Sequence, residues 1–246
     1  MAIVVDTRNN GASGAGVVTL SWSHTVNKSI GNSILVGLAS TGSASPPLMS
    51  SCVWDDGGEN TSLSKTVNGV TAEQLSGGSG FARASWWYLS APASGTKTIK
   101  FTAASSCELA AGSASYGGVS QAASFNGASP QKVQFAADTN PSTAMTSAIE
   151  ELVVDVVSMS EAADTGPGVA GSGQTQIFQQ DVGTEKSIGF GSDESGAATV
   201  TMSWTGIAVN NLGSAQIVVS LIPAPLVAYH SPAHPSSRGV IYRRVS

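Results

Sequence analysis

Histidine limits the acid–base chemistry of this sequence, because only three occur in 246 residues. His230 and His234 stand between prolines near the C-terminus, so a serine–histidine–aspartate triad would have to use His24. His24 lies beside Trp22 in a strand-like segment, and no Gly-x-Ser-x-Gly turn, which would expose a serine nucleophile, occurs in the chain. We therefore predict a structural role for His24 and no catalytic residues.

Two loops carry the letters of ligand sites. Residues 55–60, Asp-Asp-Gly-Gly-Glu-Asn, offer three carboxylates and an amide, and Ca²⁺ prefers such oxygen ligands. Their spacing is not that of a helix–loop–helix calcium site, so a solvated acidic turn is our prediction. Residues 166–171 match a dinucleotide-binding loop, but Pro167 and the Gly-Ser-Gly that ends at Gly173 cannot open a helix that would hold a pyrophosphate. We predict a flexible loop there, with no cofactor and no metal site.

Trp86, Trp87 and Tyr88 form an aromatic run that could stack on a sugar. In a strand, however, alternate side chains point to opposite faces, so Trp87 lies on one side and the other two rings on the other. At least one side must be core, and we predict that these rings fill the interior of the domain. Glycan binding remains the alternative.

Cys52 and Cys107 are the only thiols, too few for a disulfide framework and without the spacing of a zinc site. We expect two buried free thiols, with a single bridge between them as the alternative.

Charge is scarce and unevenly distributed. Hydrophobic residues make up 41% of the chain and charged residues only 11%, against about a quarter in ordinary domains. The net charge of −5 argues against broad nucleic-acid binding. Residues 1–222 carry eight basic and sixteen acidic side chains, a net charge of −8, whereas residues 223–246 carry three arginines and no acid.

Neither a secretory signal nor a membrane segment is expected. Met1 to Val5 turns polar at Asp6 without a basic start, and no apolar run reaches the roughly 18 residues that a membrane span needs. We expect a protein made and folded in the cytoplasm, or else a fragment of an exported one.

Period-two alternation dominates the chain. In residues 96–102 it places Ile99 and Phe101 on one face and Thr98, Lys100 and Thr102 on the other, as in a sheet with one dry face. In residues 17–25 it places Val18, Leu20, Trp22 and His24 on one face. The other strand-like runs are 33–39, 65–73 (a hairpin around Asn68-Gly69), 84–89, 107–116, 131–135, 152–159, 174–182, 186–190, 198–204 and 215–222.

The spacing of apolar residues from Ala144 to Val157 also fits a helix, but the valines between Leu152 and Met159 are β-branched, and we predict a strand. About twelve short strands with regular turn signals indicate an all-β, two-sheet antiparallel sandwich, with a closed barrel as the rival. No long linker divides residues 1–222, which we predict to be one sandwich domain.

The order of several segments resembles a jelly-roll-like β-sandwich module found in bacterial surface proteins and in phage virion proteins. The segments are residues 20–26, 33–38, 67–70, 87–89, 114–119, 155–157 and 200–204. The resemblance covers about residues 15–222 and implies the jelly-roll type of sandwich. It also implies a place on a cell surface or in a virion.

Residues 223–246 read as an extended basic arm. Pro223, Pro225, Pro232 and Pro235 discourage regular structure. The partner-binding candidates are Arg238, Val240, Ile241, Tyr242, Arg243 and Arg244. Alone, such an arm would be disordered. In an assembly it suits contact with a neighbouring subunit, by adding a strand or by pairing arginines with carboxylates.

These features together predict a noncatalytic virion structural protein, most simply a capsid decoration protein assembled in the host cytoplasm. Its partners would be a capsid or other virion protein and copies of itself, with no nucleic acid and no membrane. The alternative is a carbohydrate-binding or adhesion module, extracellular or on a cell surface, in a bacterial surface protein or a phage tail protein.

Overall fold

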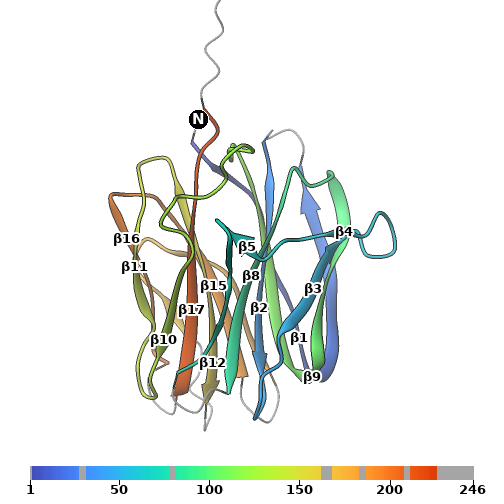
Figure 1. Ribbon diagram of the computed structural model, residues 1–246, viewed down its shortest axis with the longest axis vertical. Helices are drawn as coiled ribbons and strands as arrows, with labels where there is room; N and C mark the ends of the chain where they lie inside the picture. Colours follow the sequence, from blue (N-terminus) through green and yellow to red (C-terminus); the bar gives the residue numbers. More distant parts are fainter. Residues whose placement is uncertain are drawn as a thin grey trace, which may run out of the picture.

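The computed structural model describes residues 2–27, 32–77, 81–161, 168–182, 187–207 and 211–225. Within these ranges every regular element is a β-strand, and the strand pairs are antiparallel (Figure 1). The part of the chain that is described contains no helix long and apolar enough to cross a membrane. The prediction of an all-β antiparallel sandwich is confirmed.

The largest sheet has seven strands in the order β4-β3-β9-β2-β8-β7, with β1 paired to β9. Its strands are β1 (Val4–Val26), β2 (Ile34–Gly42), β3 (Met49–Trp54), β4 (Thr61–Ser62), β7 (Glu73–Leu75), β8 (Ala82–Ser90) and β9 (Gly95–Gly117).

Two long strands curl this sheet into a half-barrel. β1 and β9 are 23 residues each and pair along their whole length, with register shifts where the ladder bends. The first half of β9 pairs with β3 and the second half with β2, so the sheet folds back over itself. At one bulge Gly11 has φ +70°, and a Cβ there would lie 1.9 Å from the carbonyl oxygen of Ala111, so only glycine fits.

The remaining strands form three smaller sheets. A five-stranded sheet has the order β10-β17-β12-β15-β14, a three-stranded sheet the order β11-β16-β13, and a hairpin pairs β5 with β6. The strands are β5 (Thr66–Val67), β6 (Val70–Thr71), β10 (Gln131–Phe135), β11 (Ser142–Thr146), β12 (Leu152–Glu161), β13 (Val169–Ala170), β14 (Thr175–Val182), β15 (Ser187–Ser195), β16 (Thr199–Thr205) and β17 (Asn211–Leu221).

Apolar side chains fill the spaces between successive layers. The central core lies between the seven-stranded and five-stranded sheets and includes Leu38, Trp86 and Val156. A second core, with Leu35, Trp87 and Phe101, fills the inside of the half-barrel. Smaller clusters lie between the five-stranded and three-stranded sheets. The predicted two sheets are therefore the centre of the sandwich. The three-stranded sheet covers the outer face of the five-stranded sheet, and the seven-stranded sheet covers its own outer face by curling back (Figure 1).

Several local predictions are confirmed. Ile99 and Phe101 are fully buried, residues 34–42 of β2 are buried throughout, and residues 152–161 form a strand rather than a helix. Asn68 and Gly69 both have positive φ, as a two-residue hairpin turn between β5 and β6 requires.

Two local predictions are wrong. Val18 is 43% exposed, because a register shift between Val17 and Thr19 turns Val17 inward instead. Residues 96–102 and 107–116 are two halves of the single strand β9 and not two strands.

Candidate functional site

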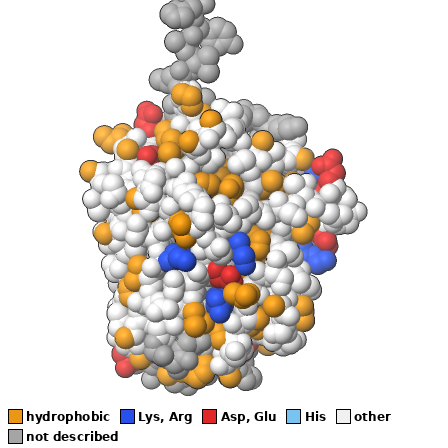
Figure 2. Space-filling model, in the orientation of Figure 1, with side chains coloured by type: hydrophobic (Ala, Val, Ile, Leu, Met, Phe, Trp, Pro, Cys, Tyr) orange, Lys and Arg blue, Asp and Glu red, His pale blue; other side chains and the backbone are white. Residues whose placement is uncertain are grey.

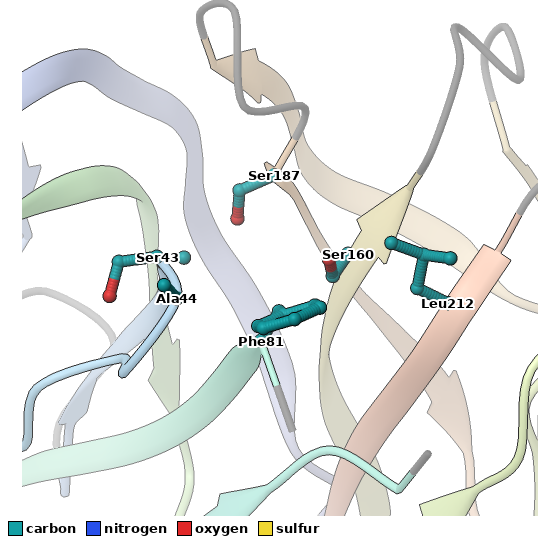
Figure 3. Close-up of a pocket in the computed structure, with 7 residues that line it drawn as sticks. Ser43, Ala44, Phe81, Ser160, Ser187 and Leu212 are labelled. Carbon is teal, nitrogen blue, oxygen red and sulfur yellow. The ribbon is translucent and has the colours of Figure 1, made fainter. Parts of the chain in front are cut away.

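A cavity of about 280 Å³ opens at one end of the sandwich, where β2 and β12 end and β8, β15 and β17 begin. We call it the pole cavity. Its lining residues are Gly42, Ser43, Ala44, Phe81, Ser160, Ser187 and Leu212 (Figure 3). Antiparallel pairing brings them together, since Gly42 pairs with Ala82 and Ser160 pairs with both Ser187 and Gly213.

The walls of the pole cavity are apolar and its polar groups are hydroxyls. In Figure 3, Phe81 lies near the centre of the view with Leu212 to its right, Ser160 lies between them, and Ser187 lies above the ring. Ser187 is 2% exposed, and its Oγ has no hydrogen-bond partner in the described part of the chain. Its backbone N–H donates to Oε2 of Glu108 at 3.0 Å.

The close approach at the base of the cavity depends on Gly42. A Cβ at this position would lie 2.3 Å from both Cβ and Oγ of Ser187, so a larger residue would push β2 and β15 apart. None of the seven lining residues is a base that could activate a serine. The described lining of the cavity is therefore suited to binding an amphipathic group.

A second hollow, of about 300 Å³, shares Gly42 and Ser43 with the pole cavity and is also lined by Ala15, Gly16, Ser106, Cys107 and Glu108. Burial, together with the nearby Glu108 carboxylate, raises the pKa of Cys107 to about 11. The thiol therefore stays protonated at neutral pH and is a poor nucleophile. Cys52 and Cys107 are both buried and free, as predicted.

His24 is the centre of a buried hydrogen-bonded chain. Its Nδ1 lies 2.9 Å from Oγ of Ser113 and its Nε2 lies 3.1 Å from Oγ of Ser115, which donates to Oδ2 of Asp6 at 2.9 Å. Burial lowers the pKa of His24 to about 4, while the Asp6 charge opposes that change. Ser113 and Ser115 are fully buried and Ser115 separates the ring from the carboxylate, so this chain fastens β1 to β9 and no substrate can reach it.

The sequence offered no signal for the partners of His24. Ser113 and Ser115 lie 89 and 91 residues away and meet the ring only because the half-barrel closes.

The acidic turn at residues 55–60 is held by lysines. Asp55 pairs with Lys97 at 2.6 Å and Asp56 with Lys100 at 3.2 Å. Hydrogen bonding to Lys97 lowers the pKa of Asp55. No group of three or more His, Cys, Asp or Glu side chains in the described ranges could hold a metal ion.

The aromatic run lies in the interior, as predicted. Trp86 is 0% and Trp87 4% exposed, and they belong to different cores on opposite faces of β8. Tyr88 is half-buried and donates its hydroxyl proton to the carbonyl of Thr66 at 3.2 Å. These rings leave no flat platform for a sugar.

Other expected sites fall partly or wholly outside the described residues. The six arm candidates Arg238, Val240, Ile241, Tyr242, Arg243 and Arg244 lie there, as do His230, His234, Gly166 and Pro167. The end of the glycine-rich run is described and corrects the flexible-loop prediction in part, since Val169 and Ala170 form β13 and pair with Thr205 and Trp204 of β16.

No protein-family model, curated protein or solved structure matches the chain. The resemblance to a jelly-roll module of surface and virion proteins therefore stays a prediction.

Proposed function

We propose that the protein is a noncatalytic structural protein of a phage particle, and specifically a capsid decoration protein assembled in the host cytoplasm. The sandwich would lie against the shell or against copies of itself, and the arm at residues 223–246 would fasten it. Many copies would turn modest single contacts into durable attachment.

The uncharged outer face of the three-stranded sheet carries this proposal. Along β11 and β16 the outward side chains are small or carry hydroxyl groups, namely Ser142, Ala144, Thr146, Thr199, Thr201, Ser203 and Thr205. The inward side chains of the same strands, such as Met202, are buried. Figure 2 shows that charged side chains are also few on the face that it presents, where several of them are grouped near the centre. A surface without charges can pack against another protein without the cost of desolvating them.

Interior polar groups support the noncatalytic part of the proposal. The most buried carboxylate, Asp155, already accepts hydrogen bonds from Ser192, Trp204 and Gln216. The carbohydrate-binding alternative is weakened because Trp86 and Trp87 are buried.

Removal of residues 226–246 tests the proposal. The truncation keeps Ala224, whose N–H donates to the carbonyl of Gly118 at 2.7 Å, so the sandwich should melt at an unchanged temperature. We expect the truncated protein to be lost from purified particles, measured as copies per particle. A matched control keeps the same tail length and exchanges Arg238, Arg243 and Arg244 for lysine, which preserves charge. Normal occupancy of the truncated protein would refute attachment through the arm.

A further inference from the structure

The pole cavity has the size and chemistry to hold one amphipathic side chain. Its volume of about 280 Å³ lies below the roughly 300–1,000 Å³ of sites that enclose a drug-sized ligand. Phe81 and Leu212 offer apolar contact, and Ser160 brings a hydroxyl group to the lining between them (Figure 3). An aromatic ring that ends in a hydroxyl satisfies both requirements, because its body is apolar and its tip can hydrogen-bond.

We propose that this cavity receives Tyr242 from the C-terminal arm of a second copy of the chain. The inference deepens the function proposed above, since it rests on a binding role for the arm and names the arm's partner. Val240 and Ile241 precede the tyrosine and Arg243 and Arg244 follow it, so the ring stands between apolar and cationic neighbours.

Charge complementarity favours this occupant. The arm carries three arginines and no acid, whereas residues 1–222 have eight basic and sixteen acidic side chains. Two of the carboxylates lie at the cavity end of the sandwich. Glu108 accepts a hydrogen bond from the Ser187 backbone, and exposed Asp181 precedes Val182, the β14 partner of Ser187. Of these two acids Glu108 is buried, so arginines beside Tyr242 would approach Asp181.

The direction of β17 favours a second copy over the chain's own cavity. Leu212, at the start of β17, lines the cavity, whereas beyond its end Ala224 is hydrogen-bonded to Gly118, beside the N-terminus at the opposite end of the sandwich (Figure 1). The eleven residues of β17 separate the two ends by about 35 Å.

The reach of the arm is short compared with that separation. The chain between Pro225 and Tyr242 has an average span of about 22 Å if flexible, and about 55 Å if fully extended. Reaching its own cavity would require a nearly straight chain around the side of the sandwich. Docking into a second copy requires no such extension and yields a head-to-tail contact, which can repeat around a ring or along a row of subunits.

Two full-length variants separate the two halves of this contact. Ala44→Trp places a large ring at an exposed lining position and blocks the cavity while the arm stays intact. Tyr242→Ala removes the side chain that docks while the cavity stays intact. Sedimentation velocity over a range of concentrations should show the unmodified protein assembling and each variant alone remaining monomeric. An equimolar mixture of the variants should form a heterodimer and nothing larger, because only one contact can be made.

Two matched changes and a measurement of folding sharpen the test. Tyr229→Ala makes the same substitution elsewhere in the arm and should leave assembly unchanged. Ser160→Ala, made in the Tyr242→Ala chain, should weaken the heterodimer by roughly 2- to 12-fold, the range expected for one hydrogen bond. Melting temperatures within a few degrees of the unmodified protein would show that each variant is folded.

The inference would be overturned if the mixture stayed monomeric. It would also be overturned if Tyr229→Ala lost assembly while Tyr242→Ala kept it. The proposed function fails or survives separately. If particles need residues 226–246 but the mixture stays monomeric, the arm binds a different virion protein and only this inference is wrong. If the mixture pairs but truncation leaves occupancy normal, the arm joins copies and the attachment proposal is wrong.

Discussion

Lowering the pH from 7 to 4 should destabilise the sandwich through His24. In the folded protein burial holds the ring neutral, and its pKa falls from 6.5 to about 4. Between about pH 6.5 and pH 4, His24 therefore binds a proton in the unfolded chain and stays neutral in the folded chain. Because the folded pKa is the lower one, the contribution is fully present above about pH 6.5 and is lost as the pH falls toward 4.

The size of the effect follows from the two pKa values. Each unit of pKa difference corresponds to about 1.4 kcal/mol, so the gap between 6.5 and about 4 amounts to about 3 kcal/mol of unfolding free energy. That is a large part of the roughly 5–15 kcal/mol by which folded domains are stable.

Urea unfolding at pH 7, 6, 5 and 4 measures this loss, with His24→Gln as the control. Glutamine keeps a donor and an acceptor near Ser113 and Ser115 but does not titrate. The other ionisable side chains away from His24 are common to both proteins, so their contributions cancel in the difference. The unmodified protein should lose about 3 kcal/mol more than the variant between pH 7 and pH 4. If the unfolding free energies of the two proteins fell in parallel as the pH was lowered, burial would not be what keeps the His24 ring neutral.

Two further predictions concern the interior. Asp155→Asn should lower the unfolding free energy by about 1–3 kcal/mol in a urea titration, because an amide cannot accept all the hydrogen bonds that the carboxylate accepts. The control Asp56→Asn, at the exposed turn, should change it by less than about 1 kcal/mol in the same titration. Equal losses would contradict the role given to Asp155. Gly112→Ala would place a Cβ 2.5 Å from Phe178 and should lower the unfolding free energy, measured by calorimetry, by about 1–3 kcal/mol. The control Gly127→Ala places its Cβ in open space and should change the unfolding free energy by less than about 1 kcal/mol. If Gly112→Ala had no effect, the two sheets could separate locally.

Alternation of side chains predicted the faces of straight strands well. It placed Ile99 and Phe101 inside, and it sent Trp86 and Trp87 to opposite cores. It failed at Val18, because a bulge adds a residue to one strand and reverses the alternation beyond it. The register shift depends on how β1 pairs with β9, and that pairing joins residues far apart in the sequence.

The pole cavity could not be predicted from the sequence, for a similar reason. Its walls come from Phe81, Ser160, Ser187 and Leu212, which share no motif and meet only where antiparallel strands begin and end together. The close approach of Gly42 to Ser187 is likewise a property of two strands and not of either residue.

Buried carboxylates join the layers of the sandwich in a way that apolar cores alone cannot. Asp193, on β15, accepts hydrogen bonds from Arg8 and Tyr116 of the seven-stranded sheet at 2.6–3.0 Å. Asp155, on β12, accepts one from Trp204 of the three-stranded sheet at 2.9 Å. Apolar contact is non-directional, so these hydrogen bonds add a directional constraint to the way the sheets pack.

A shifted layer would leave these carboxylates buried without their donors, which is strongly unfavourable. The sheets are therefore held in one registration from the half-barrel to the outer hydroxyl face. The pole cavity needs that registration, because Gly42 belongs to one sheet while Ser187 and Leu212 belong to the other. The pole cavity is thus kept in shape by hydrogen bonds far from the cavity itself.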